Sequence, residues 1–214
     1  MSNPSGRNLL LLIKSTGRSG APCLSLPVGI PVAAVLRPVA TELDAQNGQD
    51  VLHLTEWRNN HVESFLTEFL ATPSQTRRWL AKTVGPSDSR ILFMLDRLDG
   101  KSVGYMGLAF IDWASGYAEA DAVVRGCPAQ PRLMGEALRT MLSWAESQLS
   151  LRRFGVRVRS DNPAIGFYKK LDFSEVKRVP LRKHACDGVI RWEEDASIAE
   201  GDGPSLVHMR WKSD

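Results

Sequence analysis

Cysteine is scarce in this 214-residue sequence. Only Cys23, Cys127 and Cys186 are present, an odd number at wide spacing, and no Cys-x-x-Cys pair occurs. This pattern argues against a disulfide framework and against a cysteine-based zinc site. We therefore expect reduced thiols in a reducing compartment and no bound metal.

Long hydrophobic runs are also missing. The longest apolar run near the start, Leu9 to Ile13, is followed directly by Lys14. Such a run is too short for the apolar core of a secretion signal and far too short to cross a bilayer. We expect a cytoplasmic protein without a membrane partner.

Neither sign of charge dominates the composition. There are 27 basic and 24 acidic residues, for a formal net charge of +3, and no concentrated basic stripe. This balance argues against a nucleic-acid partner, whereas a small basic excess suits an anionic small ligand. Hydrophobic residues make up 43% of the chain, which is typical of a globular protein with one sizeable core.

The first 32 residues are rich in Gly, Ser and Pro, and we interpret them as an N-terminal extension. We expect this extension, which contains the apolar run Leu9 to Ile13, to be either an added edge strand or a partly ordered arm. Residues 33–214 are expected to form the main domain, with additional strands at its C-terminal end.

Hydrophobic periodicity and turn residues predict a mixed α/β domain. Asp99-Gly100 between two apolar runs is a strong hairpin signal. Apolar residues from Met134 to Leu149 recur every three or four positions, as on one face of a helix. The expected helices are residues 41–58, 60–69, 72–82, 131–149 and 162–171, and the expected strands are residues 33–39, 90–97, 102–112, 117–124, 154–159, 173–181, 189–192 and 205–211.

The first segment with chemical meaning runs from Val123 through the helix that is expected to begin at Pro131. A strand leads through a short loop into an amphipathic helix, whose first-turn N–H groups lack intrahelical partners. These groups and the helix dipole favour a bound anion such as a pyrophosphate. Gly135 and Ala137 are small enough for a phosphate to approach the backbone. The alternative is an ordinary strand-loop-helix unit with a purely structural role.

The second segment runs from Ser160 to Phe173 and reads SDNPAIGFYKKLDF. A strand ends here, Asp161 and Asn162 provide possible helix caps, and a short helix carries Tyr168. Tyr168 is either a functional phenol or a core residue whose hydroxyl is hydrogen-bonded.

These two segments, in this order, resemble GNAT acetyltransferases. The family's pyrophosphate loop reads Arg/Gln-x-x-Gly-x-Gly/Ala, and residues 132–137 (RLMGEA) match it position by position. The family's Asn, Ala, Tyr and Gly-Phe segment is similar to DNPAIGFYKKLDF. This sequence departs from the pattern because Asp161 stands at the Asn position, with Asn162 one residue later, and Asp172 replaces the Gly before Phe173.

The resemblance implies an α/β GNAT fold, a mixed central sheet flanked by helices on both faces. It also implies an N-acyltransferase that uses acetyl-CoA or another short acyl-CoA as co-substrate, without a metal. The coenzyme-binding residues that it implies are Val123, Val124, Arg132, Leu133, Met134, Gly135, Glu136, Ala137, Asp161 and Asn162.

Three residues are candidates for proton transfer. Tyr168 aligns with the family's Tyr, and its phenol, with an ordinary pKa of about 10, is protonated at neutral pH and can act as general acid. Glu119 and Asp121 are two positions apart on one strand, so they share a face, and either is a candidate base. The alternative for both carboxylates is a salt-bridged acidic edge. His53 and His61 are weaker candidates for the base.

Other segments resemble the branch of the family that acylates amino groups of nucleotide-linked sugars. They imply that Trp57, Arg58 and Asn59 bind the acceptor, with Arg58 gripping a phosphate or carboxylate. The segments are residues 57–59, 72–79, 179–182 and 191–192. A protein N-terminus, a lysine or a small amine remains an alternative acceptor, as does a non-catalytic CoA-binding or regulatory module. A homodimer also remains open.

A group of arginines next to the expected strand 154–159 has two interpretations. Their charge either attracts the coenzyme or forms a solvated face, which is the commoner role. The residues are Arg152, Arg153, Arg157 and Arg159.

Overall fold

The computed structural model describes residues 4–17, 24–42, 48–199 and 201–212. The chain divides into two compact units. Unit 1 consists of Met1–Trp57 and Thr72–Phe154, and unit 2 consists of Arg58–Ala71 and Gly155–Asp214. The chain therefore passes from unit 1 to unit 2 after Trp57, returns at Thr72, and leaves unit 1 again within a strand.

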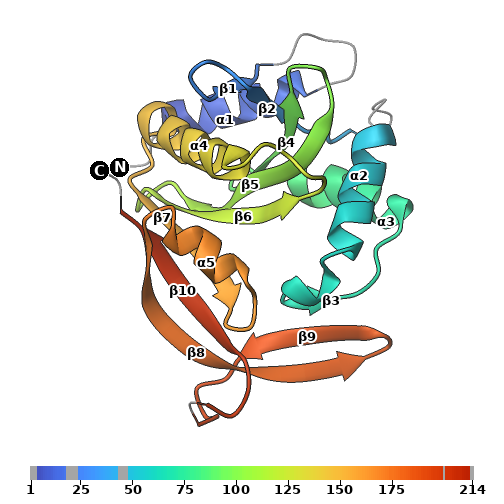
Figure 1. Ribbon diagram of the computed structural model, residues 1–214, viewed down its shortest axis with the longest axis vertical. Helices are drawn as coiled ribbons and strands as arrows, with labels where there is room; N and C mark the ends of the chain where they lie inside the picture. Colours follow the sequence, from blue (N-terminus) through green and yellow to red (C-terminus); the bar gives the residue numbers. More distant parts are fainter. Residues whose placement is uncertain (1–3, 18–23, 43–47, 200, 213–214) are drawn as a thin grey trace. The chain divides into compact units, whose positions relative to one another are not determined.

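Unit 1 is built on an antiparallel sheet (Figure 1). Most neighbouring strands follow one another directly in the sequence and are joined by short turns, but residues 39–90 separate the second strand from the third. The Asp-Gly hairpin is confirmed, because Gly100 adopts a φ of 80° in the turn. In order across the sheet, the strands are β1 (Leu26–Val28), β2 (Ala34–Pro38), β4 (Ile91–Arg97), β5 (Ser102–Asp112) and β6 (Tyr117–Arg125).

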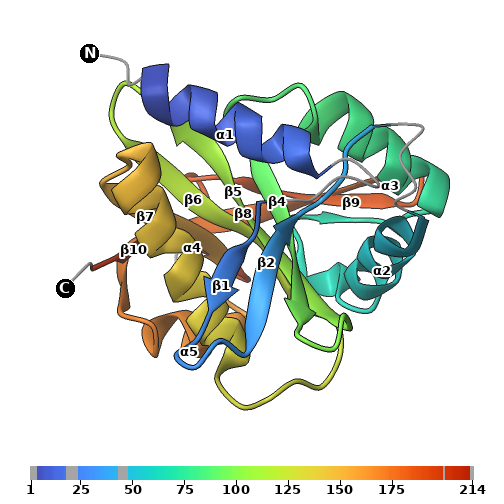
Figure 2. The same cartoon turned by 90° about the horizontal axis from the view of Figure 1, so that it is seen from above.

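The helices of unit 1 cover both sides of these strands. Figure 2 shows α2 and α3 on the opposite side from α4. Leu138, Met141 and Leu142 of α4 are fully buried, as the periodicity predicts, and Trp144 meets Phe93 of β4 edge to face. Each such apolar side chain contributes roughly 1.5–3 kcal/mol on burial. The helices are α1 (Pro4–Thr16), α2 (Gly48–Asn59), α3 (Pro73–Trp79), which continues as a π-helical turn (Leu80–Val84), and α4 (Leu133–Leu149).

Unit 2 also contains an antiparallel sheet (Figure 1). The last strand of the chain inserts between the strands that precede and follow α5, so the strands occur in the order β7-β10-β8-β9-β3. The elements are the 3₁₀ turn η1 (Val62–Ser64), β3 (Thr67–Glu68), β7 (Arg153–Arg159), α5 (Ala164–Lys169), β8 (Phe173–Cys186), β9 (Val189–Glu194) and β10 (Ser205–Trp211).

The N-terminal extension contains a helix that the sequence did not lead us to expect, and the apolar run Leu9 to Ile13 is part of it. It lies inside α1, where Leu10 and Ile13 are buried while Leu11 and Leu12 are exposed, the three-residue spacing of a helix. Pro4 suits the first position of this helix. The added edge strand is β1, which pairs with β2.

The expected helix at residues 60–69 was also wrong. These residues form η1 and the short strand β3, because Thr67 and Glu68 pair with Arg191 and Ile190 of β9. Pairing with a strand that is distant in the sequence overrides local preference here. The sequence contains no signal for this partner.

Asp172 explains one departure from the family pattern. Its φ is 67°, in the left-handed region that favours glycine, which is the residue the family has at this position. Asp and Asn tolerate this conformation better than other residues with a side chain. The turn before β8 therefore keeps its shape without glycine.

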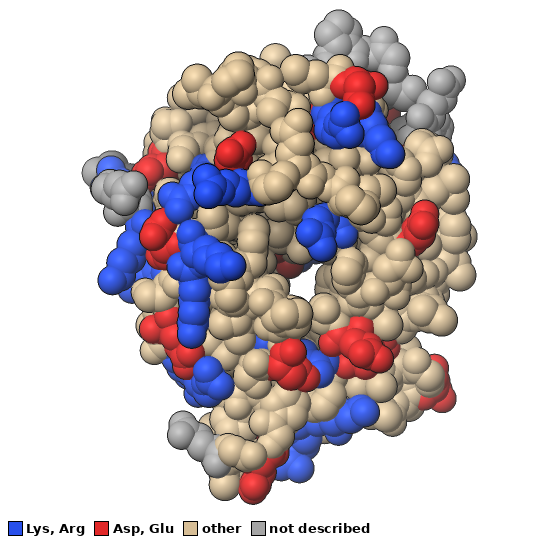
Figure 3. All heavy atoms as spheres, viewed as in Figure 1, with Lys and Arg blue, Asp and Glu red and all other residues tan. Residues whose placement is uncertain are grey.

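Four expectations from composition concern membrane spans, surface charge, the thiols and metal binding. None of the helices in the described ranges is long and apolar enough to cross a membrane. On the face drawn in Figure 3, Lys and Arg lie among Asp and Glu. Cys127 and Cys186 are free thiols, whereas Cys23 lies outside the described residues. No cluster of three potential metal ligands occurs in the part of the chain that the structure describes.

Lys14 fixes α1 to the end of the π-helical turn. Its ammonium is buried and donates hydrogen bonds to the carbonyls of Val84, at 2.5 Å, and Ser87. Burial lowers the pKa of Lys14 to about 8; Asp88 opposes this effect and Arg90 adds to it.

We predict that this lysine makes stability depend on pH above neutrality. Between pH 8 and about 10.4, the ordinary lysine pKa, the unfolded chain holds this proton more often than the folded chain. The free energy of unfolding of the wild type should therefore rise with pH through this window relative to Lys14→Met. Urea titrations of both proteins measure the difference, which should be constant between pH 6 and 7. A difference that stays constant up to pH 10 would contradict the assignment.

Candidate functional site

A β-bulge interrupts the pairing of β5 and β6. Tyr105 lies opposite Val124 and Gly107 opposite Asp121, so β6 contains one more residue than β5 in this interval. The extra residue is accommodated at Ala122, whose φ is 53°. A bulge leaves local backbone groups outside the ladder. The bulge therefore lies next to Val123 and Val124, two of the residues that the resemblance implies for coenzyme binding.

Helix α4 begins two residues later than the sequence suggested. Arg132 is the N-cap residue, with a left-handed φ of 71°, and Pro131 precedes the helix, so its expected first-turn position was wrong. The N-cap position has no side-chain cap, and the N–H of Glu136 donates to the Arg132 carbonyl at 2.9 Å. An N-terminus of this kind is suited to an anion.

The loop residues of the family pattern differ in exposure. Leu133, Gly135 and Ala137 face the core, whereas Arg132 and Glu136 are exposed and Met134 is half-buried. The buried residues therefore fix the helix on the sheet, and the exposed ones belong to its accessible side.

Gly104 brings the end of β6 close to the start of α4. A Cβ at this position would lie 2.6 Å from the carbonyl oxygen of Val124 and 3.1 Å from Sδ of Met134. Real Cβ atoms essentially never approach backbone so closely, so this position requires glycine. The bulged strand and the first turn of α4 are thus held together within unit 1.

Trp57 lies in the core of unit 1. Its ring is 3% exposed and stacks on His53, with centroids 4.6 Å apart, and on Tyr105, with centroids 6.4 Å apart. A Cβ on Gly126, in the loop between β6 and α4, would lie 2.0 Å from this ring. The described contacts of Trp57 are therefore packing contacts, and its acceptor role stays a prediction.

The two candidate bases on β6 have polar neighbours. Glu119 accepts a hydrogen bond from the hydroxyl of Tyr117 at 3.0 Å. Asp121 lies 3.7 Å from the guanidinium of Arg90, and 38% of its side chain is exposed. Both lie on one face of β6, and neither is deeply buried. A role as base stays a prediction for each of them.

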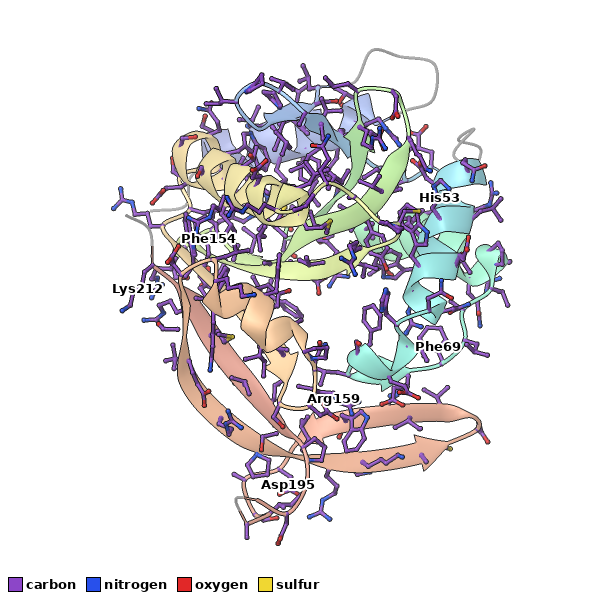
Figure 4. The ribbon with its side chains drawn as sticks, viewed as in Figure 1. His53, Phe69, Phe154, Arg159, Asp195 and Lys212 are labelled. Atoms are coloured by element: carbon purple, nitrogen blue, oxygen red, sulfur yellow. The ribbon has the colours of Figure 1, made fainter. Side chains whose placement is uncertain are left out.

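The two histidines lie in different settings. His53 lies on α2 (Figure 4), with Nε2 2.9 Å from the side-chain amide of Gln49, and Nδ1 is buried without a hydrogen-bond partner among the described residues. His61 is exposed in the turn after α2. Their weaker candidacy as base is untested.

Arg58 and Asn59 organise the segment that follows α2. Arg58 donates to the carbonyls of Phe69 at 2.6 Å and Thr67 at 2.8 Å, and its guanidinium lies over the Phe69 ring, 4.0 Å from the centroid. Asn59 donates to and accepts from the backbone of Ala71, both at 2.9 Å. These contacts close residues 58–71 into a compact loop within unit 2. Arg58 and Asn59 therefore use part of their hydrogen-bonding capacity within the segment, although the sequence led us to expect them to bind the acceptor substrate.

Asp161 and Asn162, at the family's Asn position, are bonded within their own chain. Asp161 accepts from Nε and Nη2 of Arg159, at 3.1 and 2.6 Å, and this pairing lowers the pKa of Asp161. Asn162 accepts from the N–H of Ala164 at 2.8 Å, which caps the start of α5. Coenzyme binding by these two side chains stays a prediction.

Arg159 is the centre of a charged cluster that the sequence analysis missed. Arg159, which is labelled in Figure 4, is 8% exposed. It also donates to Glu68 of β3 at 2.5 Å. Burial disfavours its charge, but hydrogen bonds to Asp161 and Glu68 raise its pKa above the ordinary value. Trp192 donates to the same Glu68 oxygen, and its ring lies 4.4 Å from the guanidinium. The sequence did not reveal this cluster because its members are far apart in the chain.

The other arginines near β7 make local contacts. Arg153 donates to the carbonyl of Ser115 at 3.0 Å, and the backbone N–H groups of Arg152 and Arg153 bond to the carbonyl of Gly116. Arg157 is half-buried. A role in attracting the coenzyme is untested.

Tyr168 lies on α5 in unit 2. It is 6% exposed, and its ring meets Phe167 and Phe173 edge to face at 5.3 and 5.4 Å. The aromatic neighbours hold the ring, so a change at the hydroxyl alone leaves this packing intact.

Comparisons with known proteins identify the family and the fold. A family model described as an acetyltransferase (GNAT) domain matches residues 35–174. A probable GNAT acetyltransferase from Chromobacterium violaceum ATCC 12472 superimposes with a TM-score of 0.63 at 21% identity, over 90% of this chain and 93% of that chain. No curated protein sequence matches the chain significantly.

Two other structures are similar at lower identity. The spermidine N-acetyltransferase from Vibrio cholerae, in complex with CoA and spermine, gives a TM-score of 0.61 at 15% identity, over 83% of this chain and 94% of that chain. The ribosomal alpha-N-protein acetyltransferase RimL, in complex with coenzyme A, gives 0.65 at 13% identity, over 87% and 97%. These likenesses concern the fold.

The contact between Gly126 and Trp57 gives a prediction. Gly126→Ala would force a methyl group into the ring, so the free energy of unfolding should fall by about 1–3 kcal/mol. The matched control is Gly166→Ala on α5, where a Cβ meets nothing within 4 Å and a helix should gain about 0.5–1 kcal/mol. Urea denaturation measures both. Equal stability of the two variants would contradict the packing described here.

Proposed function

Because the chain belongs to the acetyltransferase (GNAT) domain family, we propose that it transfers an acetyl or other short acyl group to the amine of a nucleotide-linked amino sugar. The donor is acyl-CoA. The observation that carries the proposal is the uncapped start of α4 beside the bulge in β6, within the residues that the family model matches.

The residues at this start fit the coenzyme. The first turn of α4 has backbone N–H groups for a pyrophosphate, no side chain caps its N-cap position, and Arg132 is exposed at its mouth. Backbone donors next to the bulge, at Val123 and Val124, suit the carbonyl oxygen of a thioester. Acyl-CoA supplies an acyl group that is already activated as a thioester.

Proton transfer needs one base and one acid. We assign the acid to the phenol of Tyr168, which delivers a proton to the departing sulfur. Glu119 or Asp121 accepts the proton of the amine, directly or through water, because both face one side of β6 beside the bulge. Both carboxylates are accessible enough for such an exchange.

The role of Tyr168 is tested by Tyr168→Phe. The ring contacts with Phe167 and Phe173 remain, so the protein should stay folded. We expect kcat to fall by roughly 10²-fold while KM for acyl-CoA changes little. Urea denaturation checks that the variant is folded under the conditions of the assay. Wild-type turnover of Tyr168→Phe, with chemistry rate-limiting, would remove this residue from the mechanism.

The amino-sugar acceptor rests on residues 57–59, 72–79, 179–182 and 191–192, which resemble the sugar-acylating branch. The structure changes the role that we propose for Arg58. Since its Nη1 and Nη2 donate to carbonyls of its own segment, we propose that Arg58 orders the acceptor-binding loop instead of gripping a diphosphate.

A second candidate acceptor is a cationic small amine or a protein amine. Two carboxylates, Glu68 and Asp161, share a single guanidinium in unit 2, and an excess of carboxylates favours a cationic ligand. The similar structures include a spermidine and a protein acetyltransferase. A non-catalytic module is the third candidate, and CoA binding without thiol release from any amine would support it.

The identity of the acceptor is tested by measuring the turnover of several amines by the wild type and by Arg58→Ala. The substrates are an amino-deoxy sugar nucleotide, the same sugar without its nucleotide, spermidine, and peptides with free N-termini or lysines; thiol release measures turnover. We expect the sugar nucleotide to give the highest kcat/KM. Arg58→Ala should lower kcat/KM for both sugars alike, by roughly 10–100-fold, because a charged hydrogen-bond donor of about 1.5–3 kcal/mol is lost from the loop.

Other results of this experiment would change the proposal. Turnover of peptides or spermidine without turnover of either sugar would reject the sugar assignment and leave the acyltransferase chemistry intact. If Arg58→Ala lowered kcat/KM for the nucleotide-linked sugar alone, Arg58 would contact the diphosphate directly, as the sequence analysis expects.

A further inference from the structure

Residues 58–71 leave unit 1 directly after Trp57 and belong entirely to unit 2. Arg58 and Asn59 close this segment on itself, as described above. Little regular structure holds it to the rest of unit 2, because β3 contains two residues and pairs with β9 only at Thr67 and Glu68. So short a pairing is weak by itself.

Further hydrogen bonds connect the segment to the rest of unit 2. The backbone N–H of Trp192 donates to the carbonyl of Leu66 at 2.8 Å, and the side-chain amide of Asn162 donates to the carbonyl of Ser64 at 3.4 Å. Both bonds reach the segment's backbone, whereas Glu68 contributes its side-chain carboxylate.

The carboxylate of Glu68 connects three parts of unit 2. One of its oxygens, Oε1, accepts hydrogen bonds from Nη1 of Arg159 on β7 and from the indole N–H of Trp192 on β9, both at 2.5 Å. The Glu68 side chain is 14% exposed and that of Arg159 is 8% exposed. Charge-assisted hydrogen bonds shielded from water are the strong ones, so this carboxylate is the main tie of the segment.

Removal of the Glu68 carboxylate would affect its two donors, Arg159 and Trp192, differently. Arg159 retains Asp161, which accepts from Nε and Nη2 on the outer side of the guanidinium. Trp192 would keep the cation–π contact with Arg159 but lose the acceptor of its indole N–H. The two-residue pairing and the hydrogen bonds to the segment's backbone would remain.

We propose that Glu68 is a positioning residue for the acceptor, which keeps residues 58–71 docked on β7 and β9. This inference rests on the proposed function, in which residues 58–59 belong to the acceptor side. Glu68 acts through Arg159 and Trp192, and the coenzyme-binding start of α4 belongs to unit 1, so coenzyme binding should not depend on it.

The test compares Glu68→Ala and Glu68→Gln with the matched control Glu63→Ala, an exposed glutamate on the same segment. Hydrogen exchange followed by mass spectrometry reports docking of residues 58–71. We expect at least a tenfold loss of protection in Glu68→Ala, a smaller loss in Glu68→Gln, whose amide oxygen can still accept, and none in Glu63→Ala.

Kinetics with the amine that the wild type acylates best report the acceptor site. Glu68→Ala should raise KM for the amine at least tenfold, while the Kd for CoA measured by calorimetry stays within twofold. Glu68→Gln should recover most of the loss, which separates the acceptor oxygen of residue 68 from its charge.

Three results would overturn the inference. Unchanged exchange in Glu68→Ala would show that the segment is held by other contacts. Lost protection with an unchanged KM would show that docking does not position the acceptor. An equal loss of CoA binding would indicate a general structural defect. If the wild type acylates no amine, the proposed function fails, while hydrogen exchange still decides whether Glu68 holds the segment.

Discussion

The contact between the Trp57 ring and Gly126 is the constraint from which the rest of the candidate site is built. The ring occupies the space that any side chain at position 126 would need. Gly126 lies between the bulged strand β6 and the loop that enters α4, so the last turn of α2 and this loop are fixed by one packing contact. The residue after Trp57 begins the segment that belongs to unit 2. The chain therefore passes from unit 1 to unit 2 directly after a residue whose position is fixed by packing.

Glycine and left-handed residues shape the backbone between β5 and α4. Gly104 permits the close approach of Val124 and Met134, Ala122 accommodates the bulge, and Arg132 turns the chain into α4. Left-handed conformations of residues other than glycine cost local stability and persist only where the surrounding structure holds them. Of these positions, Arg132 is the one that the family pattern contains.

The sequence predicted well those elements whose signal is local. Neighbouring residues carry the signals for three such elements, and the structure contains all of them: the helix α4, the Asp-Gly hairpin and the strand that ends at Arg125. The helix α1 was missed because a continuous run of five apolar residues fits a strand as well as a helix, and only burial of Leu10 and Ile13 distinguishes them. The strand β3 was missed because its partner β9 lies more than a hundred residues away.

The same reason explains why the charged cluster could not be foreseen. Glu68, Arg159 and Trp192 come from three strands, and only their pairing brings one carboxylate to two donors. Arg58 and Arg159 were attractive candidates for anion binding when considered as isolated residues. In the structure, the first donates to carbonyls and the second to carboxylates, so both guanidinium groups contribute to the shape of unit 2. The charge of each residue is visible in the sequence but its partner is not, because the fold decides which acceptor atom lies beside the guanidinium group.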